Sequence, residues 1–135
     1  MTSDLFHSAV NCLLGDARYR VLVVEDNADN ARLMTLLLLH FGFDVRTLFD
    51  GRLVLATARS FRPHFILLDI GLPGMDGYQV AEQLRSDSDL KDVVIIAVSA
   101  YSPDWHPSRS RPTCFNHHLT KPVGLESLLP LLILP

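Results

Sequence analysis

Runs of apolar residues divide the chain into short segments of two kinds. Residues 19–26, 64–69 and 92–100 are almost continuously apolar, whereas residues 43–49 alternate and residues 115–121 are short and polar. Continuous apolar runs of this length are typical of strands buried on both faces, and mixed runs are typical of strands at a sheet edge. The pattern therefore predicts five strands, with the three apolar ones in the centre of a sheet.

Segments with a helical spacing of apolar residues lie between these strands. Gly42 and Pro63 end two of them, Asp76 caps a third, and Pro130 interrupts the last. The predicted helices are residues 27–42, 50–63, 76–86 and 122–134. Because strands and helices alternate along the chain, we expect a parallel sheet with helices on both faces.

The fold class expected from this alternation is α/β, a doubly wound (βα)5 fold of the flavodoxin-like type. Its five-stranded parallel sheet has the known strand order 2-1-3-4-5, which places the two less apolar strands at the edges. The fourth helix should be short or irregular, because Pro103, Pro107 and Pro112 lie between the fourth and fifth strands.

The first 18 residues precede the first strand, and we treat them as an extension of one domain over residues 19–135. Apolar residues recur in the extension at helical spacing, which predicts a short amphipathic helix between Ser3 and Gly15. This helix would pack on the domain or contact a partner. Its apolar residues are Leu5, Phe6, Ala9, Val10, Leu13 and Leu14.

Composition and charge exclude several classes of protein. The 135 residues are enough for one domain, and a net charge of −3 offers no basic surface to nucleic acid. Two cysteines do not make a disulfide framework. The N-terminus lacks a secretory signal, and no apolar run reaches the roughly 20 residues of a membrane helix. We therefore expect a cytoplasmic protein without nucleic-acid or membrane partners.

Polar residues stand at the carboxyl ends of four predicted strands. In doubly wound sheets, ligands bind at this edge, where the strand order reverses. These residues are Glu25 and Asp26 after the first strand, Asp69 after the third, Ser99 after the fourth and Lys121 after the fifth. We expect the five side chains to form one site.

The charges of this set indicate what it binds. Three carboxylates that lie close together repel one another unless positive charge joins them, and Lys121 supplies only one unit. Oxygen ligands with an open side favour Mg²⁺ and then an anion such as a phosphoryl group. The alternative is that Asp26 and Asp76 only cap helices. The occurrence of five polar residues at four strand ends favours the site.

Four motifs in the chain are "VLVVEDN" (21–27), "ILLDIGLPGMDG" (66–77), "IIAVSA" (95–100) and "LTKPV" (119–123). With these motifs the chain resembles the response-regulator receiver domain of two-component signalling, the CheY-like family, over nearly its whole length. Each motif is weak alone, but all four in this order and on these elements are specific.

The resemblance implies that Asp69 is a phosphoacceptor. It would take a phosphoryl group from a phosphohistidine of a sensor histidine kinase or of a phosphotransfer protein. The resemblance also implies a Mg²⁺ site formed by Asp26, Asp69 and the backbone carbonyl of Gly71, with Glu25 acting through water.

The remaining roles also follow from the resemblance. Ser99 and Lys121 would each bind a phosphoryl oxygen, and the Lys121–Pro122 peptide bond would be cis. Phosphorylation would change a surface that binds an unknown downstream protein, so the chain would be a switch and not a turnover enzyme. His118 stands where the family usually has Phe or Tyr at its switch position. An edge-strand histidine that faces solvent is an equally good interpretation of His118.

Other functions remain open beside this one. A degenerate receiver would bind partners without phosphorylation; the altered segment before the fifth strand favours it, and the intact phosphorylation residues oppose it. A phosphatase of the haloacid-dehalogenase type needs a second Asp two residues after the first, where this chain has Gly71. A flavin- or nucleotide-binding protein would need glycines where residues 25–30 read "EDNADN". A homodimer through Trp105 and the last helix is a further hypothesis.

Overall fold

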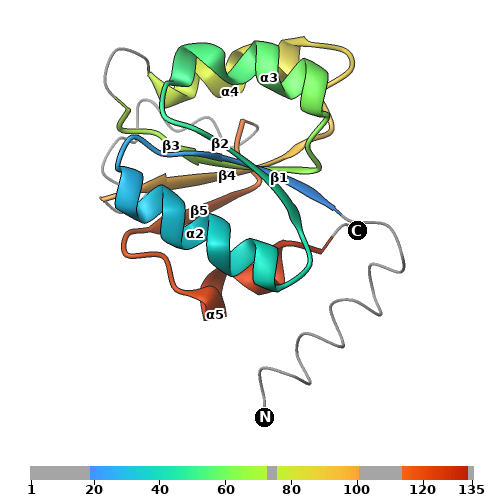
Figure 1. The fold of residues 1–135 in the computed structure, drawn as a ribbon. Coiled ribbons are helices and arrows are strands. Elements are labelled where there is room, and N and C mark those ends of the chain that lie inside the picture. Colours follow the sequence, from blue (N-terminus) through green and yellow to red (C-terminus); the bar gives the residue numbers. More distant parts are fainter. Residues whose placement is uncertain (1–18, 73–75, 101–113, 134–135) are drawn as a thin grey trace.

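The computed structural model describes residues 19–72, 76–100 and 114–133. Its centre is a parallel sheet of five strands in the order β2-β1-β3-β4-β5, which confirms the expected fold class (Figure 1). The strands are β1 (Arg20–Val24), β2 (Asp44–Leu48), β3 (Phe65–Asp69), β4 (Val94–Ser99) and β5 (His117–Thr120).

The position of each strand in the sheet follows its apolar content. Every residue of β3 is buried, and in β1 and β4 only the first residue is partly exposed. The strands β2 and β5 contain no buried residue, and they form the two edges. The prediction of three central and two edge strands is therefore confirmed.

Helices cover both faces of the sheet, with α3 and α4 on one face and α2 and α5 on the other (Figure 1). The described helices are α2 (Ala28–His40), α3 (Val54–Phe61), α4 (Gly77–Ser86) and α5 (Leu125–Leu128), with 3-10 helices at Gly51–Leu53 and Leu129–Leu131. Within the described ranges, no helix is long and apolar enough to cross a lipid bilayer.

The helix ends follow local backbone chemistry. The Asn27 side chain accepts a hydrogen bond from the Asn30 N–H at the start of α2, and the Asp76 side chain caps α4 as expected. Gly42 follows α2 with a φ of 91°, a left-handed conformation that glycine adopts without strain. At the end of α3, Arg62 takes a φ of 54°.

Side-chain alternation along the strands divides the interior into two cores. Ile66 and Leu68 of β3 pack with residues of α3 and α4. Phe65 and Leu67 pack with residues of α2 and α5 on the opposite face. Asp69 is the next residue in this alternation, so its side chain belongs to the α2/α5 side of the sheet.

The observed elements are shorter than their apolar patterns. The last helix, expected over residues 122–134, is a single turn at Leu125–Leu128 followed by a 3-10 helix. Pro130 lies in that 3-10 helix, where it has no N–H to continue α-helical hydrogen bonding. Two expected helices lie outside the described residues: the helix of the N-terminal extension and the helix between β4 and β5. Trp105 also lies outside them.

A side chain that sequence analysis did not single out connects α4 to the last two strands. Arg85 on α4 donates hydrogen bonds to the backbone carbonyls of Val93 and Cys114 and to the Asn116 side chain. The Asn116 side chain accepts the Ile95 N–H, and the Asn116 N–H donates to the Ile95 carbonyl. These contacts hold the segment before β5 against β4.

Candidate functional site

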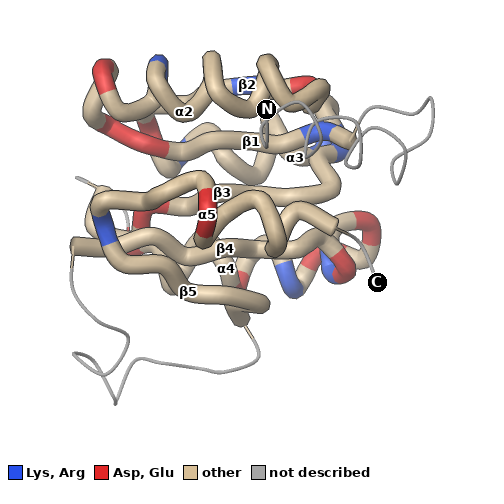
Figure 2. Tube along the Cα trace, turned by 90° about the horizontal axis from the view of Figure 1, so that it is seen from below, with Lys and Arg blue, Asp and Glu red and all other residues tan. Residues whose placement is uncertain are grey.

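The polar residues expected at the strand ends meet at one edge of the sheet. Among the described residues, the buried polar or charged ones are Glu25, Asp69 and Ser99, which stand at the ends of β1, β3 and β4. Figure 2 shows acidic residues after β1 and a basic residue after β5 at the same edge. All strands run in one direction, so their carboxyl ends come together there.

Lys121 connects two of the acidic residues. Its Nζ lies 2.7 Å from Asp69 Oδ2 and 3.0 Å from Glu25 Oε2. The Lys121–Pro122 peptide bond is cis, as the resemblance implies. Residues from three distant parts of the chain thus form one charged cluster.

Side-chain alternation separates the polar residues into two groups. Glu25, Asp69 and Lys121 lie on the α2/α5 side, where all three line a cavity. Asp69 pairs in register with Val98 of β4, so Ser99 is one residue further along. Ser99 Oγ lies 3.5 Å from Nε2 of His118 on β5. The structure therefore brings the acids and the lysine together and places Ser99 at the same edge beside His118.

The loop after β3 fixes the orientation of Asp69. The Gly71 N–H donates to Asp69 Oδ1 at 2.9 Å, so one carboxylate oxygen contacts the loop and the other contacts Lys121. A Cβ on Gly77 would come within 2.5 Å of Ile70 Cα, so only glycine lets α4 begin this close to the loop. The metal-binding role of the Gly71 carbonyl stays a prediction.

Burial and charge shift two pKa values in the cluster. Burial raises the pKa of Glu25 above its ordinary value, although the hydrogen bond from Lys121 acts in the opposite direction. Burial lowers the pKa of Lys121, but hydrogen bonds to Asp69 and Glu25 outweigh it and raise the pKa overall. The cluster therefore keeps Lys121 charged and favours added positive charge beside Glu25.

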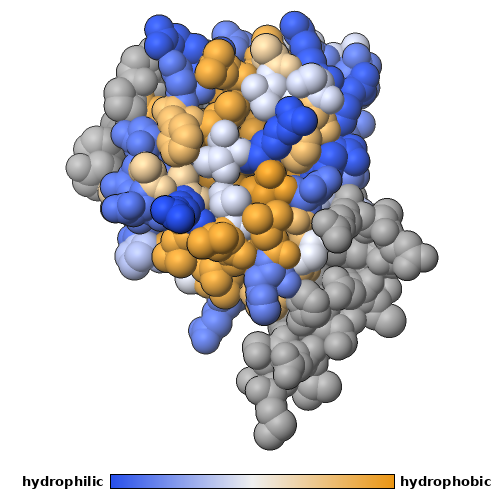
Figure 3. All heavy atoms as spheres, viewed as in Figure 1, coloured by the Kyte–Doolittle hydropathy of each residue, from blue (hydrophilic) through white to orange (hydrophobic). Residues whose placement is uncertain are grey.

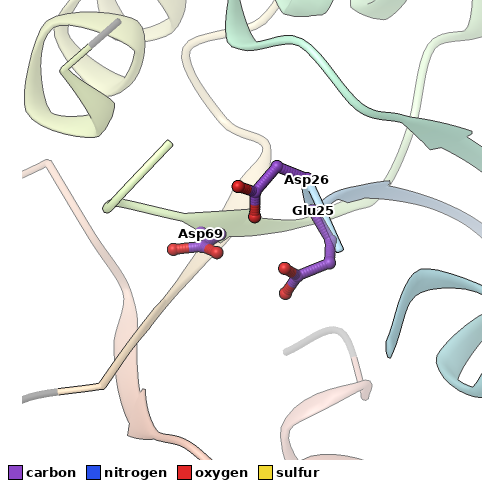
Figure 4. A group of neighbouring side chains, drawn as sticks. All are labelled: Glu25, Asp26 and Asp69. Atoms are coloured by element: carbon purple, nitrogen blue, oxygen red, sulfur yellow. The ribbon is translucent and has the colours of Figure 1, made fainter. Parts of the chain in front are cut away.

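The three acids are placed to hold a cation. Glu25, Asp26 and Asp69 each have a carboxylate oxygen within 4.8 Å of the others, and the side chains converge in Figure 4. Asp26 is exposed and is not the cap of α2, because Asn27 has that role. An all-oxygen set with one side open to solvent fits Mg²⁺ better than zinc.

His118 differs from its neighbour His117 in burial. His117 is exposed, whereas His118 is partly buried, and burial lowers the pKa of His118. The buried Nδ1 of His118 has no hydrogen-bond partner in the part of the chain that the structure describes. His118 is thus a partly buried imidazole in contact with Ser99, and its role as a switch stays a prediction.

A cavity of about 350 Å³ adjoins the acidic cluster on the α2/α5 side. Its apolar wall includes Leu33, Met34 and Leu37 of α2 and Val123 after β5. Sequence analysis did not find this cavity because its two walls are far apart along the chain. The sequence feature that could have indicated the cavity is the run of Leu and Met residues in α2.

Comparison with known families identifies the family to which the chain belongs. The family model "Response regulator receiver domain" matches residues 21–132. The chain belongs to this family. In this receiver domain, the four motifs of the sequence lie on β1, β3, β4 and β5 and deliver the clustered residues. Receiver domains of this family act in two-component signalling.

Two solved structures and one curated protein illustrate the similarity. The chain is 42% identical over 80 residues to the DNA-binding response regulator MtrA of Mycolicibacterium paratuberculosis; the match covers 59% of this chain and 36% of MtrA. Chemotaxis response regulator CheY4 of Vibrio cholerae has a TM-score of 0.78 at 25% identity, with 86% of this chain and 100% of that chain covered.

The second structure is the receiver domain of the sensor histidine kinase PA1611 from Pseudomonas aeruginosa PAO1. Its TM-score is 0.77 at 29% identity, and 85% of this chain and 94% of that chain are covered. That structure has a magnesium ion coordinated in the active site cleft. The receiver domain described here has its own cluster of acidic residues, Glu25, Asp26 and Asp69, at the carboxyl edge of its sheet.

Proposed function

We propose that this receiver domain is a phosphorylatable switch of two-component signalling. Asp69 accepts a phosphoryl group from a phosphohistidine of a sensor histidine kinase or a phosphotransfer protein in a Mg²⁺-dependent step. One observation carries the proposal: Asp69 is a buried carboxylate that lies 2.7 Å from an ammonium group and next to two further carboxylates.

The transfer requires positioning and charge compensation more than covalent chemistry. An Asp69 oxygen attacks the phosphorus, the new O–P bond forms as the P–N bond breaks, and the histidine nitrogen leaves with the electron pair. Lys121 moves from its contact with Asp69 to a phosphoryl oxygen. Mg²⁺ held by Glu25, Asp26 and Asp69 would offset the carboxylate charge as the dianionic group approaches.

The product of this step stays on the protein as an acyl phosphate. The residue two positions after Asp69 is Gly71, so the general acid of a haloacid-dehalogenase-type phosphatase is absent from that position. We therefore propose a switch without catalytic turnover of a substrate.

The signal follows from the new charge on Asp69. Ser99, at the end of the neighbouring strand, turns toward a phosphoryl oxygen and gives up its 3.5 Å contact with His118. The end of β4 moves with Ser99 and changes the surface offered to a downstream protein.

Phosphorylation by a small donor tests the proposal. The chain is incubated with Mg²⁺ and acetyl phosphate, and intact mass is measured. The unsubstituted chain should gain one phosphoryl group, and Asp69→Asn should gain none. Asp29→Asn is the matched control, because Asp29 is an exposed acid in the first turn of α2 outside the cluster; it should be phosphorylated like the unsubstituted chain.

Two outcomes contradict the proposal. Phosphorylation that persists in Asp69→Asn would place the acceptor elsewhere. A folded, unsubstituted chain that takes up no phosphoryl group and binds no beryllofluoride, with Mg²⁺ present, would support the degenerate receiver that binds partners without phosphorylation.

A further inference from the structure

The cavity beside the acidic cluster has a floor that belongs to the sheet. Val23 of β1, Leu67 of β3 and Val98 of β4 line it, and all three are buried. Val23 and Leu67 also pack in the α2/α5 core, whereas Val98 belongs to neither core of the described chain. The floor is therefore apolar strand surface that the helices on this side do not fill.

The walls of the cavity come from two remote parts of the chain. Met34 and Leu37 of α2 form one wall, and Pro122 and Val123 after β5 form the other. Figure 3 shows hydrophobic side chains gathered over α2 and the neighbouring part of α5, on the side of the domain where the cavity lies.

The size of the cavity suits a small molecule. Its volume of about 350 Å³ lies within the range of pockets that bind small ligands. It is more than twice the roughly 150 Å³ of an apolar protein cavity that binds benzene. The space is therefore sufficient for an apolar body that consists of one ring and a short chain.

The charged groups that line the cavity belong to the acidic cluster. They are Glu25, Asp69 and Lys121, and Asn30 is a further polar residue of the lining. Lys121 Nζ already contacts both carboxylates, so the two acids and one ammonium leave one negative charge in excess. An apolar pocket with a few convergent polar groups is the usual form of a small-molecule site.

The excess negative charge favours a ligand with a cationic head group. Asp69 accepts one hydrogen bond from the Gly71 N–H and one from Lys121, which leaves about two of the roughly four acceptor positions of an ionised carboxylate. A cation can therefore join the cluster without displacing Lys121. An anion would lie against two carboxylates, or it would have to take Lys121 away from both.

We infer that the cavity binds a small amphipathic amine, whose apolar body lies between α2 and the sheet and whose ammonium donates hydrogen bonds to Glu25 and Asp69. An ammonium has three donors, enough to contact both carboxylates at once. The apolar walls favour a ligand that combines this head group with a ring or an alkyl chain.

Binding of the amine has a consequence for the acidic cluster. The ammonium would contact carboxylates that hold Mg²⁺ in the proposed function, so the amine and Mg²⁺ would each weaken the binding of the other. This consequence rests on the proposed function, whereas binding of the amine in the absence of Mg²⁺ does not.

Three probes with the same apolar body test the preference for a cation. Phenylbutylamine, phenylbutanol and phenylbutanoate are titrated into the full chain in the presence of a chelator, and binding is measured by calorimetry. We expect one amine to bind per chain, with a Kd about tenfold lower than that of the alcohol, which corresponds to about 1.4 kcal/mol. The acid should bind more weakly than the alcohol, and butylamine should bind more weakly than phenylbutylamine.

Two substitutions locate the binding in the cavity. Leu37→Trp enlarges a wall residue and should raise the Kd of the amine and of the alcohol about tenfold. Leu55→Trp is the matched control, because Leu55 is a partly buried leucine of α3 that lines a different groove; it should change neither value. Circular dichroism checks that both chains fold, and Val123→Trp replaces Leu37→Trp if that chain does not.

A charge substitution tests the contact with the head group. Glu25→Gln should raise the Kd of the amine and leave that of the alcohol unchanged, because only the amine uses the negative charge. Glu126→Gln, at an exposed position of α5, is the control. In the unsubstituted chain, millimolar Mg²⁺ should weaken binding of the amine and not of the alcohol.

Four results would overturn the inference. They are no binding of any probe, equal affinities for the amine and the alcohol, tighter binding of the acid, and equal effects of the Leu37→Trp and Leu55→Trp substitutions. The titrations contain no phosphoryl donor, so a chain that binds the amine but is not phosphorylated at Asp69 would contradict only the proposed function. A chain that is phosphorylated but binds no amine would contradict only this inference.

Discussion

Lys121 is the side chain on which the charge balance of the acidic cluster depends. It is 28% exposed, and its ammonium contacts Asp69 and Glu25 while Asp26 lies nearby. Three carboxylates therefore share one positive charge. Removal of that charge leaves carboxylates close together with no described cation between them, and bound Mg²⁺ would take over its role.

Lys121→Met should lower the free energy of unfolding by about 1–2 kcal/mol without divalent cations, because the pair is only partly buried. Millimolar Mg²⁺ should recover part of the loss. Urea unfolding with and without Mg²⁺ measures both effects. Lys91→Met, at an exposed lysine, is the control and should change little. A Lys121→Met chain as stable as the unsubstituted one in chelator would show that the carboxylates do not repel significantly.

His118 is one of the residues at this edge of the sheet whose pKa differs from its ordinary value. Its pKa is lowered by burial, so the folded protein favours the neutral ring. The unfolded chain binds a proton near an ordinary pKa of about 6.5. Stability from the neutral ring is therefore complete above that pH, and it is lost as pH falls through it toward the lower folded-state pKa.

His118→Phe should remove this loss and the buried, unpartnered Nδ1. We expect a chain more stable by about 1 kcal/mol near neutral pH, with a smaller decrease on acidification. Urea unfolding at about pH 7.5 and about pH 5.5 compares the two chains on either side of the unfolded-state pKa. His117→Phe at the exposed neighbouring position is the control. An unchanged pH dependence in His118→Phe would exclude His118 as a titrating group.

The elements α4, β4 and β5 are connected by Arg85. Its guanidinium donates hydrogen bonds to backbone carbonyls before β4 and before β5, and burial lowers its pKa. The carbonyls of Lys91, Val93 and Cys114 lie just outside the strands. Arg85 thus adds hydrogen bonds to the backbone near the start of β4 and before an edge strand that contains only four residues.

Arg85→Met keeps the aliphatic stem but leaves these carbonyls without their donor. We expect a loss of about 2–3 kcal/mol in the free energy of unfolding, and faster hydrogen exchange in β5 than in β1. Arg59→Met is the matched control, because Arg59 is an exposed side chain whose ion pair with Asp87 should contribute little to stability. Equal losses in the two variants would contradict a special role for Arg85.

The domain as a unit consists of two cores that share the same three central strands. Leu84 of α4 belongs to one core, and Leu128 of α5 belongs to the other. The strand β3 is buried on both faces, so neither core can open without exposing side chains of the sheet that also supports the other core. We therefore expect cooperative unfolding of both faces.

Leu128→Ala should lower the free energy of unfolding by about 2–4 kcal/mol and still give one transition. Far-UV circular dichroism in urea, together with hydrogen exchange of α4, measures whether the face opposite α5 loses protection in the same transition. Ser127→Ala, at an exposed position of α5, is the control. Two separate transitions would show that α5 unfolds independently.

Particular residues show how far sequence reasoning reached. Apolar patterns predicted the burial of β1, β3 and β4 and the edge positions of β2 and β5. They could do so because a strand that is buried on both faces has apolar residues at nearly every position. Clustering of Glu25, Asp69 and Lys121 was predicted from strand ends and strand order. The contact between Ser99 and His118 was not predicted, since it depends on register and on which face each side chain takes. Arg85 gave no signal, because an arginine on a helix is usually exposed.

Local patterns in the amino-acid sequence were sufficient for the five strands, the capping of α4 and the family, since each depends on residues close together along the chain. Tertiary structure decided the rest: the different contacts of the two carboxylate oxygens of Asp69, the shifted pKa values, the cavity, and the exposed side of α2. Each of these depends on distances between segments that are remote in sequence. A sequence pattern shows which residue types are found at each position. The packing of the folded chain then decides which side chains touch, and those contacts determine their pKa values and their exposure to solvent.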